Sequence, residues 1–143
     1  MDRAAEDLAA AAGYLADLPA VDGAIGTVGF GAGGSLALWS ATLCGKIVAA
    51  VGFYPVLPWE RMRPDWSNYA GKAALVHASA EEDSAGVHAT KQAIEAAGGT
   101  VTVYDYPGTR HAFFNDDRPE VYHPQAAATA WACTLELFRS RLA

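Results

Sequence analysis

The chain has 143 residues, of which 52% are hydrophobic and 18% charged, enough to bury the core of one domain and too few for two ordinary ones. A formal charge of −6 without a local cluster of Lys and Arg argues against nucleic acid as a partner. No apolar run reaches membrane-spanning length and the amino-terminal residues are charged, so the sequence predicts a single domain (1–143) in the cytoplasm, with no membrane partner.

The hydrophobic pattern alternates between helical and strand periods along the whole chain. In chain order it predicts a helix at 2–17, a strand at 24–30, a glycine-rich turn and helix at 35–44, a strand at 47–53, a proline-rich loop at 54–71, a strand at 73–78, a helix at 85–97, a strand at 101–106 and a helix at 124–142. Because no two strands are joined by a hairpin turn, the predicted fold is α/β, with about four parallel strands flanked by helices in a three-layer sandwich.

The turn at residues 29–34 (Gly-Phe-Gly-Ala-Gly-Gly) lies between a strand and a helix and has two interpretations. As G-x-G-x-x-G it matches a dinucleotide-binding fingerprint, which needs an acidic residue at the end of the next strand. The first acid after that strand is Glu60, inside the loop, so this remains a distant alternative. Gly29-x-Gly31-x-Gly33 also has the frame of a nucleophile elbow, G-x-S-x-G, with Gly31 in place of the nucleophile.

Two polar residues follow the later strands in the order that an elbow enzyme requires, nucleophile, acid, base. Asp83 follows the third strand and His111 follows the fourth. Parallel strands end at the same edge of a sheet, so both side chains are expected near Gly31. There a carboxylate could orient the imidazole, which would act as general base and then as acid. Asp83 also has a structural alternative, because it directly precedes a helix and could serve as its N-cap.

The sequence resembles the dienelactone hydrolases in residues 28–34, in the Glu-Glu-Asp turn ending at Asp83, and in the run Tyr-Pro-Gly-x-x-His-Ala-Phe-Phe-Asn-Asp around His111. These are α/β-hydrolases that usually carry Cys or Ser between the elbow glycines and cleave lactone or ester bonds. The resemblance implies that Gly31 occupies the nucleophile position, that Asp83 and His111 are the triad acid and base, and that the Ala32 N–H is an oxyanion donor. It implies no cofactor.

Two departures from the family pattern shape the expected function. Gly31 supplies no nucleophile, and the elements that the family places before the elbow helix, including a second oxyanion donor, have no counterpart in this chain. We therefore expect impaired hydrolysis of a small ester or lactone. The alternatives are a non-catalytic small-molecule-binding or protein-interaction module, and a fragment whose other half lies on another chain. The elbow strand should form an exposed edge, which predicts a homo-oligomer that covers it.

The remaining polar and aromatic candidates have plainer interpretations. His77 should make a buried hydrogen bond, and Ser35 is a conceivable substitute nucleophile whose side chain should instead point along its helix. Trp59, Trp66 and Tyr69 in the proline-rich loop could line a pocket or could simply fix the loop. The four histidines lack metal-ligand spacing, so no metal site is expected.

Overall fold

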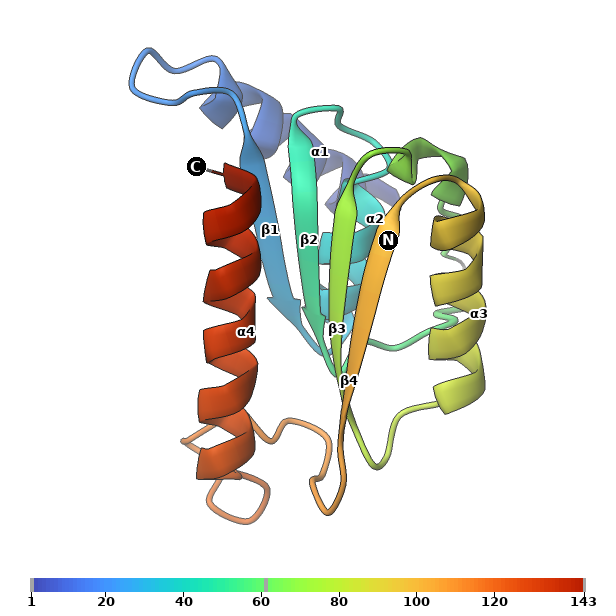
Figure 1. Ribbon diagram of the computed structural model, residues 1–143, viewed down its shortest axis with the longest axis vertical. Helices are drawn as coiled ribbons and strands as arrows, with labels where there is room; N and C mark the ends of the chain where they lie inside the picture. Colours follow the sequence, from blue (N-terminus) through green and yellow to red (C-terminus); the bar gives the residue numbers. More distant parts are fainter. Residues whose placement is uncertain (1, 61, 143) are drawn as a thin grey trace.

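A computed structural model describes residues 2–60 and 62–142 (Figure 1). The helices are α1 (Asp2–Ala16), α2 (Ala32–Ser40), α3 (Ser84–Ala96) and α4 (Pro124–Leu142), with a short 3-10 helix, η1 (Trp66–Tyr69). The strands are β1 (Ile25–Phe30), β2 (Ile47–Phe53), β3 (Ala73–Ser79) and β4 (Thr100–Tyr106).

The four strands are parallel and lie in the order β1-β2-β3-β4, which confirms the α/β fold expected from the sequence. Their carboxyl ends are in register: Phe30 pairs with Phe53, and Phe53 with His77. The loops that follow β1, β2, β3 and β4 therefore meet at one edge of the sheet. This is the edge where open α/β sheets place their binding sites.

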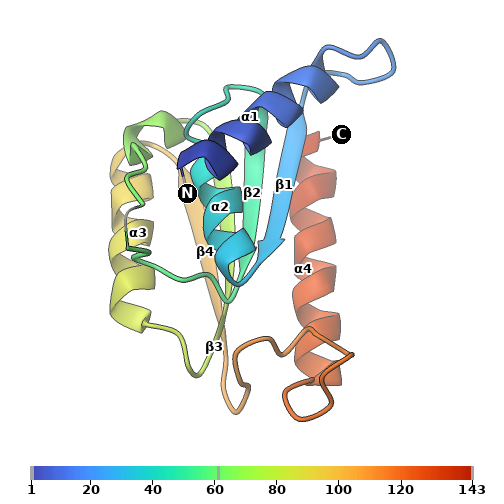
Figure 2. The ribbon, with the colours of Figure 1, turned by 180° about the vertical axis from the view of Figure 1, so that it is seen from behind.

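Helices cover both faces of the sheet and create two apolar cores. Helices α1, α2 and α3 pack on one face, where Leu38, Ile47 and Ile94 are among the buried residues (Figure 2). Helix α4 alone covers the other face and buries Val51 and Phe53 with the loop after β4 (Figure 1). Because β2 and β3 are covered on both sides, they are nearly continuous apolar runs, as expected for central parallel strands.

Helix α2 begins at Ala32, three residues earlier than the pattern predicted, and ends at Ser40. The reason is a close crossing of β1 and α2. A Cβ on Gly29 would lie 2.0 Å from the Gly33 carbonyl oxygen, so only a glycine lets the helix start directly off the strand. The helix axis consequently points its amino-terminal end at the carboxyl edge of the sheet.

Strand β1 is an edge strand: within residues 2–60 and 62–142, its ladder partner is β2 alone. Helix α1 packs mainly against α2 rather than over this edge. Val28 and Phe30, on the side of β1 that faces α4, are 39% and 42% exposed. The structure thus has the exposed elbow-strand edge that the sequence predicted.

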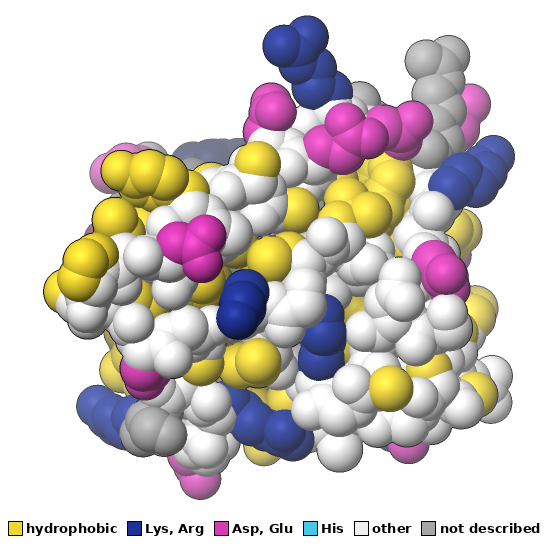
Figure 3. Space-filling model, turned by 90° about the horizontal axis from the view of Figure 1, so that it is seen from above, with side chains coloured by type: hydrophobic (Ala, Val, Ile, Leu, Met, Phe, Trp, Pro, Cys, Tyr) yellow, Lys and Arg dark blue, Asp and Glu magenta, His cyan; other side chains and the backbone are white. Residues whose placement is uncertain are grey.

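The end of the molecule opposite the carboxyl edge shows acidic and basic side chains interspersed with scattered hydrophobic ones (Figure 3). Within the part of the chain that the structure describes, none of the helices is long and apolar enough to cross a membrane. Cys44 and Cys133 are free thiols, and both are partly rather than fully buried.

Candidate active site

Gly31 forms the turn between β1 and α2 in a conformation that side-chain-bearing residues rarely adopt, with φ 58° and ψ −127°. Its N–H donates to the Phe53 carbonyl oxygen at 2.9 Å, and its own carbonyl accepts from the Gly34 N–H at 2.9 Å. The turn is therefore tied to β2 on one side and to the first turn of α2 on the other. A residue held this way projects above the sheet edge, as a nucleophile elbow requires.

His111 faces the position where a side chain on Gly31 would lie. A Cβ placed on Gly31 would be 3.7 Å from His111 Nε2, and apart from Gly31 and its two chain neighbours no other described residue has an atom within 4 Å of it. A hydroxyl or thiol one bond beyond that Cβ would come within hydrogen-bond reach of the ring nitrogen. The structure thus brings Gly31 and His111 together, and the space between them is open.

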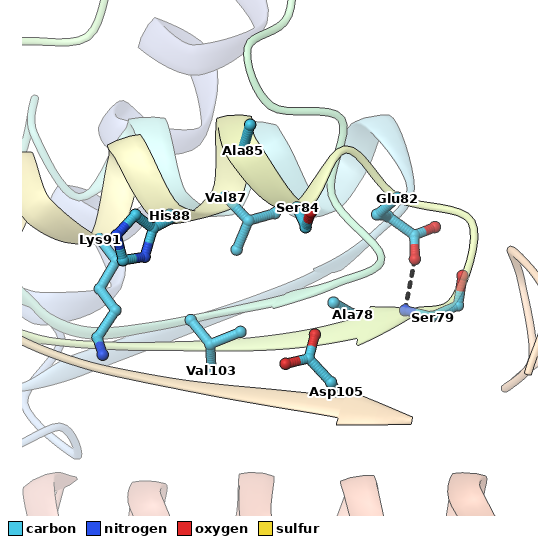
Figure 4. A pocket seen from close by; sticks show the side chains of 10 residues that line it. All are labelled: Ala78, Ser79, Glu82, Ser84, Ala85, Val87, His88, Lys91, Val103 and Asp105. Atoms are coloured by element: carbon cyan, nitrogen blue, oxygen red, sulfur yellow. Dashed lines mark hydrogen bonds between the residues drawn. The ribbon is translucent and has the colours of Figure 1, made fainter. Parts of the chain in front are cut away.

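The carboxylate beside His111 belongs to Glu82. Glu82 Oε1 lies 2.7 Å from His111 Nδ1, and its side chain is only 5% exposed whereas that of His111 is 45% exposed. The second carboxylate oxygen accepts from the Ser79 backbone N–H, which Figure 4 shows as a dashed line. An ionised carboxylate only accepts hydrogen bonds, so Nδ1 is the donor, and in the neutral form of the ring the Nε2 lone pair faces Gly31.

The structure places Asp83, the acid expected beside the histidine, at the start of a helix instead. Helix α3 begins at Ser84, which makes Asp83 its N-cap, and the Asp83 carboxylate accepts from the Ala85 and Gly86 N–H groups at 3.0 and 3.2 Å. Glu82, one residue earlier and one methylene longer, turns back toward β4. The N-cap alternative was visible in the sequence, but the choice between adjacent acids depends on the residue at which the helix begins.

A third acid of the same turn, Glu81, holds the backbone of the histidine loop. Its carboxylate accepts from the His111 N–H at 2.8 Å and pairs with Arg110 at 3.3 Å. These two interactions, led by the backbone hydrogen bond, hold the pKa of Glu81 below its usual range. The turn after β3 therefore fixes both the ring and the main chain of His111.

A pocket of about 510 Å³ opens over Gly31 and His111. It is lined by Phe30, Gly31, Tyr54, His111, Ala112, Phe114, Asn115, Asp116 and Arg118. The lining combines aromatic side chains with polar residues of the loop after β4. Tyr54, which no sequence motif marks as part of a site, packs its ring edge-on against the imidazole at a centroid distance of 5.0 Å. Burial raises the pKa of Tyr54 to about 12, so its phenol stays neutral beside the histidine.

Ser35 and His77 do not belong to this site. Ser35 is fully buried, and its hydroxyl donates to the Val56 carbonyl at 2.8 Å while accepting from the Val56 N–H at 2.9 Å. It fixes the loop after β2 and is not a substitute nucleophile. His77 is buried and bonded through both ring nitrogens, to the Tyr106 hydroxyl and to Thr134, as the sequence predicted.

The aromatic residues of the proline-rich loop fix that loop in place. The buried Tyr69 hydroxyl donates to the Leu38 carbonyl at 2.6 Å, and Trp59 and Trp66 pack against the core under α2 and α3. None of the three lines the pocket over Gly31. Of the two alternatives that the sequence left open, the structure supports the anchoring role.

A second hollow, between α3 and β4, lies on the far side of Glu82 and is lined by His88, Lys91 and Asp105 (Figure 4). Among the described residues, no three His, Cys, Asp or Glu side chains are grouped as ligands for a metal ion.

Ala32, named by the resemblance as an oxyanion donor, is the first residue of α2. The N–H groups of a first helical turn have no partner within the helix and favour negative charge.

The site combines a glycine elbow, a histidine that faces it and a buried carboxylate behind that histidine. The model of the dienelactone hydrolase family matches residues 1–142. The chain belongs to the dienelactone hydrolase family. Among curated proteins, none matches it significantly.

Solved structures of dienelactone hydrolase-like proteins and of an esterase share this fold. A candidate dienelactone hydrolase from Klebsiella pneumoniae subsp. pneumoniae MGH 78578 superposes with a TM-score of 0.78 at 25% identity, over 93% of this chain and 59% of its own. A dienelactone hydrolase-like promiscuous phosphotriesterase from metagenomic libraries gives 0.73 at 21% identity, over 93% and 59%. A butyrate-bound thermophilic esterase from Thermogutta terrifontis gives 0.66 at 18% identity, over 96% and 64%. This family member thus spans about three-fifths of the length of these structures.

Proposed function

We propose that this member of the dienelactone hydrolase family binds a small ester or lactone beside His111 and has lost covalent catalysis at position 31. One observation carries the proposal: the open position over Gly31 lies 3.7 Å from His111 Nε2, and the Glu82 carboxylate supports the opposite side of the ring at 2.7 Å. The general base and its carboxylate partner remain, while the group on which the base would act is absent.

The chemistry of such a site follows from its parts. The aromatic side chains that line the pocket suit the body of a small ester or lactone, and the Ala32 N–H, the first of α2, would donate to its carbonyl oxygen. Without a nucleophile no acyl-enzyme forms, and loss of a triad nucleophile costs several orders of magnitude in rate. The expected behaviour is ligand binding with slow turnover, which combines impaired hydrolysis with the small-molecule-binding alternative.

Restoring the nucleophile tests the proposal. Gly31→Ser puts a hydroxyl at the open position, and its hydrolysis of p-nitrophenyl acetate should exceed that of the wild type by about 10²-fold or more. The matched control is the double variant Gly31→Ser with His111→Ala, which should return to the wild-type rate. Fast hydrolysis by the wild type that depends on His111, or a folded serine variant no faster than the wild type, would contradict the proposal.

We also propose that a second copy of this chain covers the β1 edge. The support is the outer side of β1, which pairs with no other strand among the described residues, together with the apolar side chains of Val28 and Phe30, which are 39% and 42% exposed. Open strand edges pair readily with other strands unless they are covered. Two β1 strands related by a two-fold axis would continue the sheet from one copy into the next.

A further inference from the structure

The empty side-chain position over Gly31 is itself a small binding site next to a base. We propose that it accepts a small thiol from solution, which takes the place of the missing nucleophile and receives the acyl group of a bound ester. The inference rests on the proposed function, because it needs an ester in the same pocket. It adds a second substrate, and with it an acyl-transfer activity that the chain alone could not perform.

The geometry favours an external nucleophile at this point. The hydrogen bond between Nδ1 and Glu82 at 2.7 Å places the single proton of a neutral imidazole on Nδ1. Apart from the chain neighbours of Gly31, Nε2 is the described atom nearest to the vacant position, at 3.7 Å. A molecule seated over Gly31 can therefore donate its proton to Nε2. The pocket is continuous with this position, since Gly31 and His111 both line it, so the nucleophile can enter from the same side as the ester.

A thiol fits the position better than water for two reasons. Thiols ionise many orders of magnitude more readily than water, so an imidazole can deprotonate them at neutral pH. The walls next to the vacancy are aromatic: Phe30, Tyr54 and Phe114 line the pocket, and polarisable sulfur packs well against aromatic rings. A thiol with one or two carbons has about the size of the side chain that Gly31 lacks.

The proposed reaction balances without any further reactant. The thiol proton passes to His111 Nε2, and the sulfur attacks the ester carbonyl carbon. The carbonyl oxygen carries the developing negative charge toward the Ala32 N–H. As the tetrahedral intermediate collapses, the C–S bond remains, the C–O bond to the alcohol breaks, and His111 returns the proton to the leaving oxygen. The products are one thioester and one alcohol.

The test follows nitrophenolate release from p-nitrophenyl acetate by the wild-type protein as ethanethiol concentration is raised. The rate above the uncatalysed reaction should rise about tenfold or more, a modest part of what a positioned base contributes, and should saturate. Mass spectrometry should identify S-ethyl thioacetate as the product. 2-Methyl-2-propanethiol, whose carbon beside sulfur is fully branched, should give little increase.

Three variants serve as controls. His111→Ala and Gly31→Ala, which respectively remove the base and place a methyl group in the vacancy, should both abolish the saturable increase. His88→Ala removes an exposed histidine outside the pocket and should keep it. If Gly31→Ala does not fold, as judged by circular dichroism, the comparison of His111→Ala with His88→Ala decides the question.

The inference would be overturned if the rate rose linearly with ethanethiol concentration, without saturating, and equally in the wild type and in His111→Ala. That outcome differs from failure of the proposed function. If the Gly31→Ser variant still hydrolyses the ester faster than the wild type, the pocket and its base are intact and only thiol binding has failed.

Discussion

At the scale of single residues, Glu82 and Asp83 are chemically similar neighbours with different environments. Glu82 is nearly buried and contacts the imidazole, whereas Asp83 satisfies two amides at the start of α3. Both are acids in the turn after β3, and nothing in the sequence pattern distinguishes Glu82 from the expected Asp83. Their roles differ because α3 begins at Ser84, which makes Asp83 the N-cap. Hydrophobic periodicity locates helix ends only to within a few residues, so it could not distinguish the two acids.

Substitution of Glu82 should lower kcat, whereas substitution of Asp83 should lower stability. In the Gly31→Ser background, Glu82→Gln should lower kcat for ester hydrolysis by about 10²- to 10⁴-fold, because an amide cannot orient and stabilise the protonated ring as a carboxylate does. Asp83→Ala should leave kcat nearly unchanged and lower the free energy of unfolding by about 1 kcal/mol through the lost N-cap. Steady-state kinetics and urea denaturation measure both quantities. A larger kcat loss for Asp83→Ala than for Glu82→Gln would restore Asp83 as the acid.

His77 should make the fold sensitive to acid. Thr134 Oγ1 donates to the Ala130 carbonyl, so it accepts from the Nε2–H of His77, while Nδ1 accepts from the Tyr106 hydroxyl. The ring is therefore held neutral, and burial lowers the pKa of His77 from 6.5 to about 4. The unfolded chain binds a proton at a higher pH than the folded one, so stability is fully present above pH 6.5 and is lost as the pH falls toward 4.

Between pH 6.5 and pH 4 the free energy of unfolding should fall by about 3 kcal/mol because of His77. Urea denaturation of the wild type at pH 7 and pH 4.5 measures it, with His77→Gln as the comparison. The variant should be less stable than the wild type at pH 7 and should lose less stability between the two pH values. Equal losses in both proteins would show that His77 does not control the acid sensitivity.

At the scale of elements, the crossing of β1 and α2 determines where the elbow projects. Gly29 and Gly33 look alike in the sequence motif but have different surroundings. A Cβ on Gly29 would lie 2.0 Å from the Gly33 carbonyl oxygen, whereas a Cβ on Gly33, its chain neighbours and its own helix backbone aside, would meet no described atom within 4 Å. The first glycine is needed for close packing. The second occupies an open helical position.

Alanine at each glycine separates these roles. Gly29→Ala should lower the free energy of unfolding by about 3 kcal/mol or more, because strand and helix must move apart. Gly33→Ala should leave stability unchanged or raise it by up to about 1 kcal/mol, because alanine is the better helix former. Urea denaturation monitored by circular dichroism measures both. Similar stabilities for the two variants would contradict the close crossing.

Most elements were predictable from the sequence because their apolar runs match the strand or helix period clearly. The strand Ile47–Phe53 and the helix Pro124–Leu142 have the predicted bounds, the first from a continuous apolar run and the second from Pro124 at its first turn. The start of α2 was not predictable, because glycines have low helix propensity and only the contact between Gly29 and Gly33 reveals why the helix includes them. Tyr54 was missed because its role depends on tertiary contact with His111.

At the scale of the whole molecule, the exposed β1 edge carries the prediction of a dimer or larger assembly. Sedimentation velocity of the wild type at micromolar concentration should show it, and Val28→Lys should shift the population toward monomer because a charged residue opposes pairing at a strand edge. Leu43→Lys, at another exposed apolar residue in the turn between α2 and β2, should leave the assembly unchanged. A clean monomer of the wild type at these concentrations would contradict the proposal.

The central claim is that Gly31 occupies an otherwise intact elbow facing a functional His111–Glu82 pair. Treating Gly31→Ser with a p-nitrophenyl alkylphosphonate, followed by mass spectrometry of the digested protein, tests it most directly. We predict one covalent adduct on residue 31, none in the wild type, and at least a tenfold slower reaction when His111→Ala is added, since the hydroxyl then lacks its base. A folded Gly31→Ser protein that gains no adduct at residue 31 would contradict the account.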